Sequence, residues 1–275
     1  MTLRHAVNVS PLIPVAGDPL PDGSRPHWSP LAHTLVHGPT EAVVVDPPIT
    51  AAQGDALADW IAAAGVRLTD VYLTHWHADH WLSTVRLLAR FPSARVHASV
   101  RTAERIRDAE VPGALWTSLF PGQLPESPRA FPIHSGEFTI DGEPVVPVEV
   151  GHSDTDDTTV LHVPSLSLVA AGDVVYDNVH LYLAETPGGG AEAWHAALDR
   201  VAALRPSVVV AGHQDARRPD SPANIDETRR YLDEALKILE SSPSRREFFF
   251  RIVERFPDRI NPTITWLSAS RLLPS

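Results

Sequence analysis

The sequence predicts an α/β domain followed by a helical C-terminal extension. Short apolar runs typical of buried strands alternate with segments of helical periodicity as far as about residue 220. Beyond that point the pattern predicts helices and no strand. The 275 residues suffice for one large hydrophobic core or two small ones. We therefore expect a main domain over residues 1–220 and, packed on the same domain, a helical extension over residues 221–275.

The first half of the chain begins with a proline-rich segment, residues 1–30, that is expected to be irregular. A hairpin of buried strands around Gly38 and Pro39 follows, and Thr50 is placed to cap the next helix. The elements expected in this half are strands at 35–37, 41–46, 71–73 and 95–97, and helices at 50–64, 79–90 and 100–108.

The second half opens with residues 109–136, which combine many prolines with aromatic side chains. They are too apolar for a solvated linker, so we expect a long loop or lid. The elements expected after it are strands at 145–150, 159–163, 166–171 and 208–211, a helix at 191–204, and extension helices at 223–240, 244–255 and 262–271.

Composition narrows the classes of function. The net charge of −11 disfavours sequence-independent binding of nucleic acid, which needs Lys and Arg to neutralise phosphates. The chain has no cysteine, so disulfides and thiolate metal ligands are excluded. No run of about 18 apolar residues occurs, and residues 1–8 lack the apolar stretch of an export signal. We therefore expect a cytoplasmic protein that binds neither nucleic acid nor membrane.

The most informative motif is Thr-His-Trp-His-Ala-Asp-His at residues 74–80. It places three imidazoles and a carboxylate within six residues, directly after the apolar run at 71–73. Neutral imidazole nitrogen and carboxylate oxygen are the usual non-sulfur ligands of zinc and related ions. Because burying such a cluster in an apolar core carries a large desolvation cost, the motif predicts a metal site in a cleft.

Three further candidate ligands stand in the same setting, each directly after a glycine that ends or follows an apolar run: His152, Asp173 and His213. Glycine lets the backbone turn sharply or approach another group closely. Loops beyond the strand ends could converge on one cleft. Seven ligands are too many for one catalytic zinc ion, which takes about three protein ligands. They suit two ions that share a carboxylate and a hydroxide.

This ordered set resembles the signature of the metallo-β-lactamase fold superfamily, His-x-His-x-Asp-His followed by a distant His, Asp and His. The resemblance runs from about residue 34 to 215. It implies a four-layer αβ/βα sandwich with two divalent metal ions between the sheets, zinc first and iron or manganese as alternatives. The implied ligands are His75, His77 and His152 for one ion, Asp79, His80 and His213 for the other, and Asp173 as a bridge. Asp46 stands where the superfamily usually has an aspartate that orients a ligand imidazole.

Two catalytic roles follow from the resemblance. Asp79, besides binding a metal, would carry a proton to the leaving group. Tyr176 follows Asp173 by three residues, the offset of a tyrosine in the acyl-homoserine lactonases of the superfamily. By that resemblance it would donate a hydrogen bond to the developing oxyanion. A tyrosine that packs in the loop is the alternative.

The chain departs from lactonases and glyoxalase II proteins after His152, where an acidic turn replaces Pro-Gly-His. The turn, residues 153–157, contains Asp154, Asp156 and Asp157. Asp156 or Asp157 would support a ligand or cap a turn, and a solvated turn is the simpler reading. The departure argues against a specificity copied from either group of relatives.

The function expected from the resemblance is that of a dinuclear hydrolase, in which a metal-bridging hydroxide attacks a small, apolar carbonyl substrate, an ester or lactone first. The alternatives are a β-lactamase or thioesterase, a mononuclear iron enzyme like the persulfide dioxygenases, and a metal-binding protein without turnover. The last is disfavoured because a structural zinc site needs four closed ligands.

Aromatic side chains near the ligands are expected to wall the cleft. Trp76 and Trp81 each stand beside a ligand histidine; core packing is the simpler reading of such aromatics, and only for Trp76 is a place in the wall equally expected. The 109–136 segment supplies a lid, and residues 180–183 line one side. Apolar walls favour a hydrophobic small molecule over a highly charged one. The helical extension either caps the core, covers the cleft or forms the interface of a homodimer.

Overall fold

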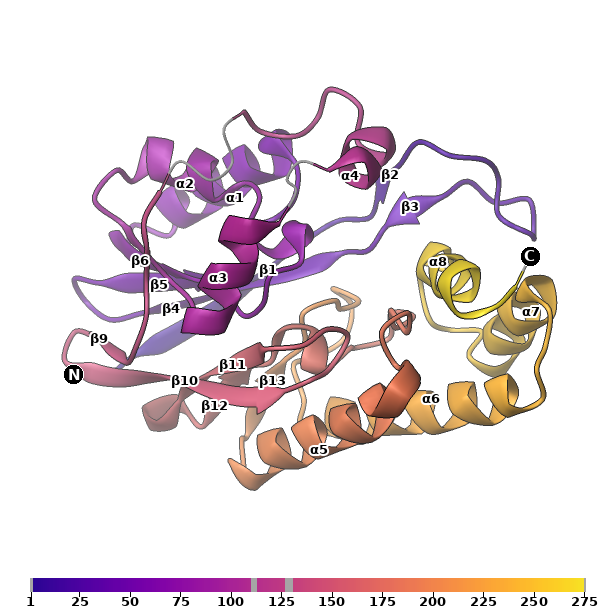
Figure 1. Ribbon diagram of the computed structural model, residues 1–275. Coiled ribbons are helices and arrows are strands. Elements are labelled where there is room, and N and C mark those ends of the chain that lie inside the picture. Colours follow the sequence, from indigo (N-terminus) through magenta and orange to yellow (C-terminus); the bar gives the residue numbers. More distant parts are fainter. Residues whose placement is uncertain (1, 110–112, 127–130, 275) are drawn as a thin grey trace.

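The computed structural model describes residues 2–109, 113–126 and 131–274 (Figure 1). Two mixed sheets lie face to face in the middle of the molecule, and helices cover the outer face of each. This is the four-layer αβ/βα sandwich that the resemblance implied. Apolar side chains of both sheets fill the space between them, including Leu3, Val36, Val43, Val45, Tyr72, Val145, Leu161, Leu168 and Val210.

The first sheet has the strand order β1-β4-β5-β6-β7-β8. Pairing is antiparallel from β1 to β5 and parallel from β5 to β8. Its strands are β1 (Arg4–Ser10), β4 (Leu31–His37), β5 (Ala42–Val45), β6 (Leu68–Tyr72), β7 (Arg95–His97) and β8 (Ile133–His134). The strands expected at 35–37, 41–46, 71–73 and 95–97 all fall in this sheet, which confirms their type.

The expectation that residues 1–30 are irregular is wrong at the start of the chain. Strand β1 pairs with β4 over seven residues, from Arg4 opposite His37 to Ser10 opposite Leu31. The first proline is Pro11, so no residue of β1 lacks the amide that a strand ladder needs. Two short strands, β2 (Ile13–Pro14) and β3 (His27–Trp28), also pair with each other in this segment.

The second sheet has the order β13-β12-β11-β10-β9, with the single parallel pair at β12 and β13. Its strands are β9 (Phe138–Ile140), β10 (Glu143–Gly151), β11 (Thr158–Val163), β12 (Leu168–Ala170) and β13 (Val208–Val210). The turn between β10 and β11 contains the aspartates Asp154, Asp156 and Asp157. Consecutive strands therefore bring that turn, the end of β12 and the end of β13 toward one edge.

The helices form the outer layers. Those of the first half are α1 (Ala51–Ala63), α2 (Thr84–Arg90), α3 (Val100–Asp108) and α4 (Ala114–Leu119), and those of the second half begin with α5 (Gly190–Ala203). The Thr50 side chain accepts a hydrogen bond from the Gln53 amide at 3.2 Å, which confirms it as the cap of α1. The helix expected at 79–90 begins only at Thr84, because Ala78–His80 forms a separate 3₁₀ turn.

The segment at 109–136 is not a plain loop in its described part. It contains α4, and Phe120 directly after that helix is fully buried against Trp28 and Trp116. The Trp28 and Trp116 rings meet edge to face, with centroids 5.1 Å apart. Apolar burial on this scale explains why so many aromatic residues occur here. The expectation for residues 110–112 and 127–130 lies outside the described residues.

The C-terminal extension consists of α6 (Ala223–Glu240), α7 (Arg245–Arg255) and α8 (Thr263–Leu272), as expected. Leu232 of α6 and Phe248 of α7 belong to the same apolar core as Leu198 of α5 and Val209 of β13. The extension therefore packs on the second sheet's helical layer, and a boundary at residue 220 stays a prediction. Within the described ranges, no helix combines the length and apolarity needed to span a membrane.

Candidate metal centre

The predicted ligands come together from three loops at one edge of the two sheets. His75, His77, Asp79 and His80 follow β6, Asp173 lies in the 3₁₀ turn Gly172–Val174 after β12, and His213 follows β13. The rings of His75 and His80 have centroids 4.2 Å apart, and those of His80 and His213 5.3 Å apart. All of these side chains except His77 are buried.

One cluster combines Asp79 and His80 of the loop after β6 with His213 of the loop after β13, and Asp173 lies beside them. The Nε2 atom of His213 lies 3.4 Å from Asp79 Oδ2 and 3.3 Å from Asp173 Oδ2. The Nε2 atom of His80 lies 3.2 Å from Asp173 Oδ1 and 3.8 Å from Asp79 Oδ2. Ligands bound to one ion at about 2.1 Å lie about 3 to 3.5 Å from each other. The separations fit the predicted site of Asp79, His80 and His213 with Asp173 beside it.

A second cluster forms around the other two imidazoles of the motif. It consists of His75, His77 and Asp154, whose nearest ligand atoms all lie within 4.8 Å of one another. Asp154 Oδ2 is 2.7 Å from His77 Nδ1 and 3.8 Å from His75 Nε2. Sequence reasoning missed Asp154, because it treated the acidic turn as solvated. The available signal was its position two residues beyond His152.

The structure does not bring His152 to the ligand place predicted for it. In the part of the chain that the structure describes, His152 belongs to no cluster of three potential ligands. Its Nδ1 pairs with Asp156 Oδ1 at 2.7 Å. Its Nε2 faces the start of α5, where a Cβ added to Gly190 would lie 2.7 Å away. This position follows from the turn after β10, which directs Asp154 rather than His152 toward His77.

Asp46 holds two of the ligand rings in place. Its carboxylate accepts hydrogen bonds from the Thr74 amide at 2.8 Å and the Thr74 hydroxyl at 2.7 Å, and its Oδ2 lies 3.0 Å from His80 Nδ1. Thr74 Oγ1 in turn lies 2.9 Å from His75 Nδ1. A proton on His80 Nδ1 leaves its Nε2 lone pair free for an ion. The geometry agrees with the orienting role expected for Asp46.

The remaining ring is oriented by the backbone. His213 Nδ1 lies 2.9 Å from the carbonyl oxygen of Pro30 in the loop before β4. A carbonyl only accepts, so Nδ1 carries the proton and Nε2 faces the cluster. Each of His75, His80 and His213 therefore has one nitrogen engaged away from the cluster and the other directed into it.

Several buried atoms at the two clusters have no hydrogen-bond partner among the residues that the structure describes: His75 Nε2, His80 Nε2, Asp154 Oδ2 and Asp173 Oδ1. Leaving such groups desolvated and unpaired is costly, and a divalent cation is the group that satisfies all of them at once. The donor set of imidazole nitrogen and carboxylate oxygen suits zinc and its neighbours. The residues present thus fit metal ions.

Burial and the neighbouring carboxylates shift the pKa values of the imidazoles. Burial lowers the pKa of His75 well below its usual value. Burial alone would do the same to His77 and His213, but Asp154 raises the pKa of His77 to about 10 and Asp173 raises that of His213 to about 10. A metal ion that binds these rings must displace the proton, because a ligand imidazole is neutral.

Two glycines make the convergence possible. A Cβ added to Gly212, directly before His213, would overlap the Asp173 carboxylate and the backbone of Gly172. Gly172 has a φ of +49°, and a Cβ there would lie 2.5 Å from Thr74 Oγ1. The glycines that precede Asp173 and His213 are therefore required for close approach, as their positions in the sequence indicated.

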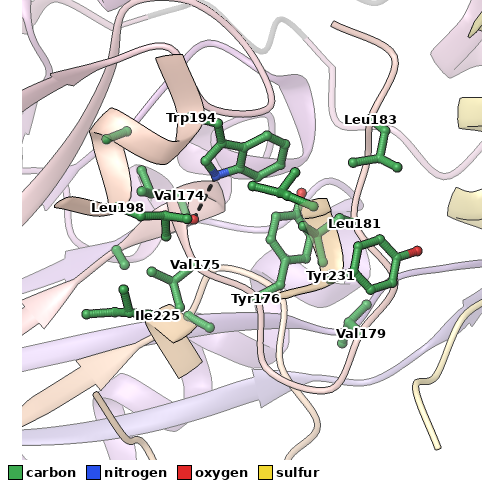
Figure 2. Close-up of a cluster of buried hydrophobic side chains, with 14 of the residues drawn as sticks. Val174, Val175, Tyr176, Val179, Leu181, Leu183, Trp194, Leu198, Ile225 and Tyr231 are labelled. Atoms are coloured by element: carbon green, nitrogen blue, oxygen red, sulfur yellow. Dashed lines mark hydrogen bonds between the residues drawn. The ribbon is translucent and has the colours of Figure 1, made fainter. Parts of the chain in front are cut away.

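Tyr176 lies against the candidate centre with its ring in the core of the second layer. Figure 2 shows the ring among Val179, Leu181 and Trp194. Its hydroxyl donates a hydrogen bond to Asp173 Oδ2 at 2.6 Å. Burial first, and the Asp173 charge second, raise the pKa of Tyr176 well above its usual value, so the hydroxyl stays protonated. The role of oxyanion donor stays a prediction.

A cavity opens onto the clusters. His77, Asp79, Asp154, Asp173, Tyr176 and His213 form its polar base. Its walls are Trp28, Leu115, Trp116 and Leu119 on one side, Ile264, Leu267 and Arg271 of α8 on another, with Tyr182. Helix α4 of the 109–136 segment and α8 of the extension thus both line the cavity, and the role of a lid stays a prediction.

The expected wall residues of the motif itself lie elsewhere. Trp81 is fully buried in the first core and donates its indole N–H to the Trp76 carbonyl at 2.9 Å. Trp76 donates to Thr155 Oγ1 at 2.9 Å and lines a different depression with Arg105. Trp76 is therefore not a wall of this cavity, and Trp81 has the core position that was its simpler reading. Of residues 180–183, Tyr182 lines the cavity.

Comparisons with known proteins agree with this geometry. The family model described as the metallo-beta-lactamase superfamily matches residues 33–213. Metallo-beta-lactamase type 2 of Bacteroides fragilis is 25% identical over 178 residues, 64% of this chain and 65% of that protein. Hydroxyacylglutathione hydrolase of Synechococcus sp. (strain CC9605) is 41% identical over 66 residues, 24% of this chain and 25% of that protein. The matches thus span less than two thirds of these relatives.

Solved structures share the fold. The DIM-1 metallo-beta-lactamase exposed to ceftazidime superimposes with a TM-score of 0.59 at 19% identity, covering 86% of this chain and 98% of the other. A metallo-beta-lactamase from Pontibacter korlensis gives 0.57 at 20% identity, covering 83% and 99%. At this identity the likeness speaks for the fold, and the family match covers more than half of the chain. The chain belongs to the metallo-β-lactamase superfamily.

Proposed function

We propose that the protein is a two-metal hydrolase of a small apolar carbonyl compound, an ester or lactone. The observation that carries the proposal is the pair of adjacent ligand clusters at the base of a largely apolar cavity. Zinc is the first candidate for both ions, because imidazole and carboxylate donors suit it and cysteine is absent. The similar proteins from Bacteroides fragilis and Synechococcus both carry names of hydrolytic enzymes.

Divalent ions in such a pair of sites supply an activated water and polarise a carbonyl oxygen. The protein's own residues position the reaction. Asp79 lines the cavity and accepts a hydrogen bond from the Trp28 indole N–H at 3.0 Å, which fixes its carboxylate beside the cavity wall. Asp79 is thereby placed to pass a proton to a leaving group. Tyr176 places its hydroxyl on Asp173 at the same base.

The cavity walls support an apolar substrate. Trp28, Trp116 and Leu267 would contact the acyl or ring portion of a bound molecule. Arg271 is exposed and stands at the wall made by α8. It offers a site for an anionic group on one end of the substrate, which favours a β-lactam or another carboxylate-bearing compound as the second candidate.

The test is a hydrolysis screen of the zinc-loaded protein with lactones, aryl esters, thioesters and β-lactams. We expect turnover of a neutral lactone or ester to exceed that of the other classes. His77→Ala should abolish it, whereas His5→Ala, an exposed histidine on β1, should not change it. Activity that survives in His77→Ala would place the chemistry at another site. A zinc-loaded protein inactive on every class would overturn the proposal.

A further inference from the structure

We propose that Asp154, and not His152, is the third protein ligand of the metal site formed by His75 and His77. The proposal deepens the function proposed above by redefining its site, but it stands on ligand geometry alone. Each half of the centre would then hold two imidazoles and one aspartate of its own, with Asp173 between them.

Asp154 is placed beside both imidazoles of this site. Its Oδ2 lies 2.7 Å from His77 Nδ1 and has no hydrogen-bond partner among the described residues. His75 Nε2 is 3.8 Å from the same oxygen and has no hydrogen-bond partner either. Asp154 is 1% exposed. A buried carboxylate and a buried imidazole that both lack partners are explained by an ion between them.

Hydrogen bonds within the turn hold Asp154 inward. The Ser153 hydroxyl donates to Asp154 Oδ1 at 3.0 Å, which leaves Oδ2 free. The Ser153 amide donates to the Thr155 carbonyl at 2.9 Å, and Thr158 Oγ1 donates to the same carbonyl at 3.0 Å. These bonds close the turn on itself, so the orientation of Asp154 does not depend on a mobile side chain.

The outer residues of the turn are engaged elsewhere. Arg105 of α3 donates to Asp157 Oδ2 at 2.7 Å and lies 3.4 Å from Asp156 Oδ2. These two acidic residues therefore anchor the turn to the helical layer and are not candidates for the metal. Of the three aspartates of the turn, Asp154 alone belongs to a cluster of potential ligands among the described residues.

His152 lies on the other side of the turn from His75 and His77. Its Nδ1 pairs with Asp156, and its Nε2, although buried without a hydrogen-bond partner among the described residues, faces the entry to α5, where a Cβ added to Gly190 would come within 2.7 Å. Glu185 itself accepts a hydrogen bond from Thr155 Oγ1 at 2.9 Å and lies 3.5 Å from His77 Nε2. His152 thus packs behind the turn, while Glu185 steadies the far side of the His77 ring.

The experiment compares Asp154→Asn with His152→Gln, a matched change in the same loop. The metal-free full-length proteins are titrated with Co²⁺, followed by visible absorption, and zinc content is measured after equilibrium dialysis. We expect Asp154→Asn to bind one ion normally and the other at least about a hundredfold more weakly, since even a partner of a ligand contributes 10- to 100-fold. His152→Gln should bind two ions with the unmodified spectrum.

Two controls keep the outcome clear. The metal-free Asp154→Asn protein should unfold in one cooperative transition like the unmodified protein, at a lower temperature at neutral pH because it loses the charge pair with His77. In addition, NMR of the zinc-loaded unmodified protein should show that no metal ion binds the His152 ring. The signal of His152 is assigned by its absence in His152→Gln. Two tightly bound ions in Asp154→Asn, loss of an ion in His152→Gln, or a metal-bound His152 ring would each overturn the proposal. None of these measurements depends on finding a substrate.

Discussion

At the scale of single residues, the candidate centre is defined by which nitrogen or oxygen each side chain leaves free. Asp46 and the Pro30 carbonyl engage the outer nitrogens of His80 and His213, and the inner nitrogens then face Asp173. Asp46 has a φ of +52°, a left-handed conformation that aspartate tolerates better than most residues. Asp46 directly follows β5, and from this position its carboxylate contacts Thr74 and His80.

Substitution of Tyr176 distinguishes two roles at this scale, because one predicts weaker metal binding and the other a lower kcat. In Tyr176→Phe the hydrogen bond to Asp173 disappears while the apolar ring packing stays. We expect the affinity for one metal ion to fall about tenfold, the lower end for a group that orients a ligand. Metal affinity is measured by competition with a chromophoric chelator, and kcat with metal in excess.

The alternative for Tyr176 is the oxyanion donor of the lactonase resemblance. That role requires kcat to fall about a hundredfold at saturating metal, with metal affinity as in the unmodified protein. Tyr231→Phe is the matched control, since Tyr231 is equally buried in the same core but does not line the cavity. Unchanged metal affinity and unchanged kcat would exclude both roles.

At the scale of elements, the cavity is assembled from parts that are distant in the sequence. Helix α4 supplies Trp116, strand β3 supplies Trp28, and α8 supplies Leu267 and Arg271. The Asn261 side chain, just before α8, lies 2.7 Å from the Ser29 hydroxyl, which is next to β3. The extension and the paired strands β2 and β3 are therefore joined beside the cavity. The extension therefore takes part in the proposed substrate site and is more than a cover for the core.

Arg271 on the last turn of α8 provides the test at this scale. We expect Arg271→Gln to raise KM several-fold for substrates that bear a carboxylate, because an exposed ion pair contributes up to about 1 kcal/mol. Neutral esters and lactones should keep their kcat/KM. Arg90→Gln, an exposed arginine on α2, changes the net charge equally without touching the cavity. Equal losses for charged and neutral substrates would argue against charge recognition by Arg271.

Elements also show where prediction from the sequence reaches its limit. The convergence of His75, His77, Asp79, His80, Asp173 and His213 was predictable, because their motif and the glycines before two of them constrain the backbone. Asp154 was not, because three aspartates of one turn are equivalent in a sequence until Arg105 engages two of them. Trp76 was misplaced for a related reason: residue spacing alone does not show that its indole lies against Thr155 and Arg105 and not in the cavity.

At the scale of the whole molecule, the extension is fixed to the main domain through the loop after Tyr176. The amide of His180 donates to the Ile260 carbonyl at 3.1 Å, and its Nδ1 lies 3.0 Å from the Tyr231 hydroxyl of α6. Arg259 donates to the Val179 carbonyl at 2.6 Å and stacks over the Tyr231 ring. Strand order alone does not predict these contacts, since they join an irregular loop to helix α6 and to the segment before α8, about 50 and 80 residues away in sequence.

His180 makes the stability of this arrangement depend on pH. Burial first, and the Arg259 charge second, lower the pKa of His180 to about 3. In the unfolded chain the pKa of a histidine is near 6.5. Between pH 3 and pH 6.5 the unfolded chain therefore binds a proton at His180 that the native state does not bind. The contribution of His180 is therefore complete above pH 6.5 and is lost as the pH falls below it, at about 1.4 kcal/mol per pH unit.

We expect His180→Asn to remove this acid sensitivity, because the Asn amide can keep the bond to Tyr231 without gaining a charge. The free energy of unfolding of the metal-free protein should fall by about 1.4 kcal/mol less in the variant than in the unmodified protein between pH 7.5 and 5.5. Urea unfolding at the two pH values measures it, and the subtraction cancels the titration of the metal ligands common to both proteins. Equal losses in the two proteins would mean that His180 is protonated in the native state, and that the junction of the extension with the main domain opens well before the molecule unfolds.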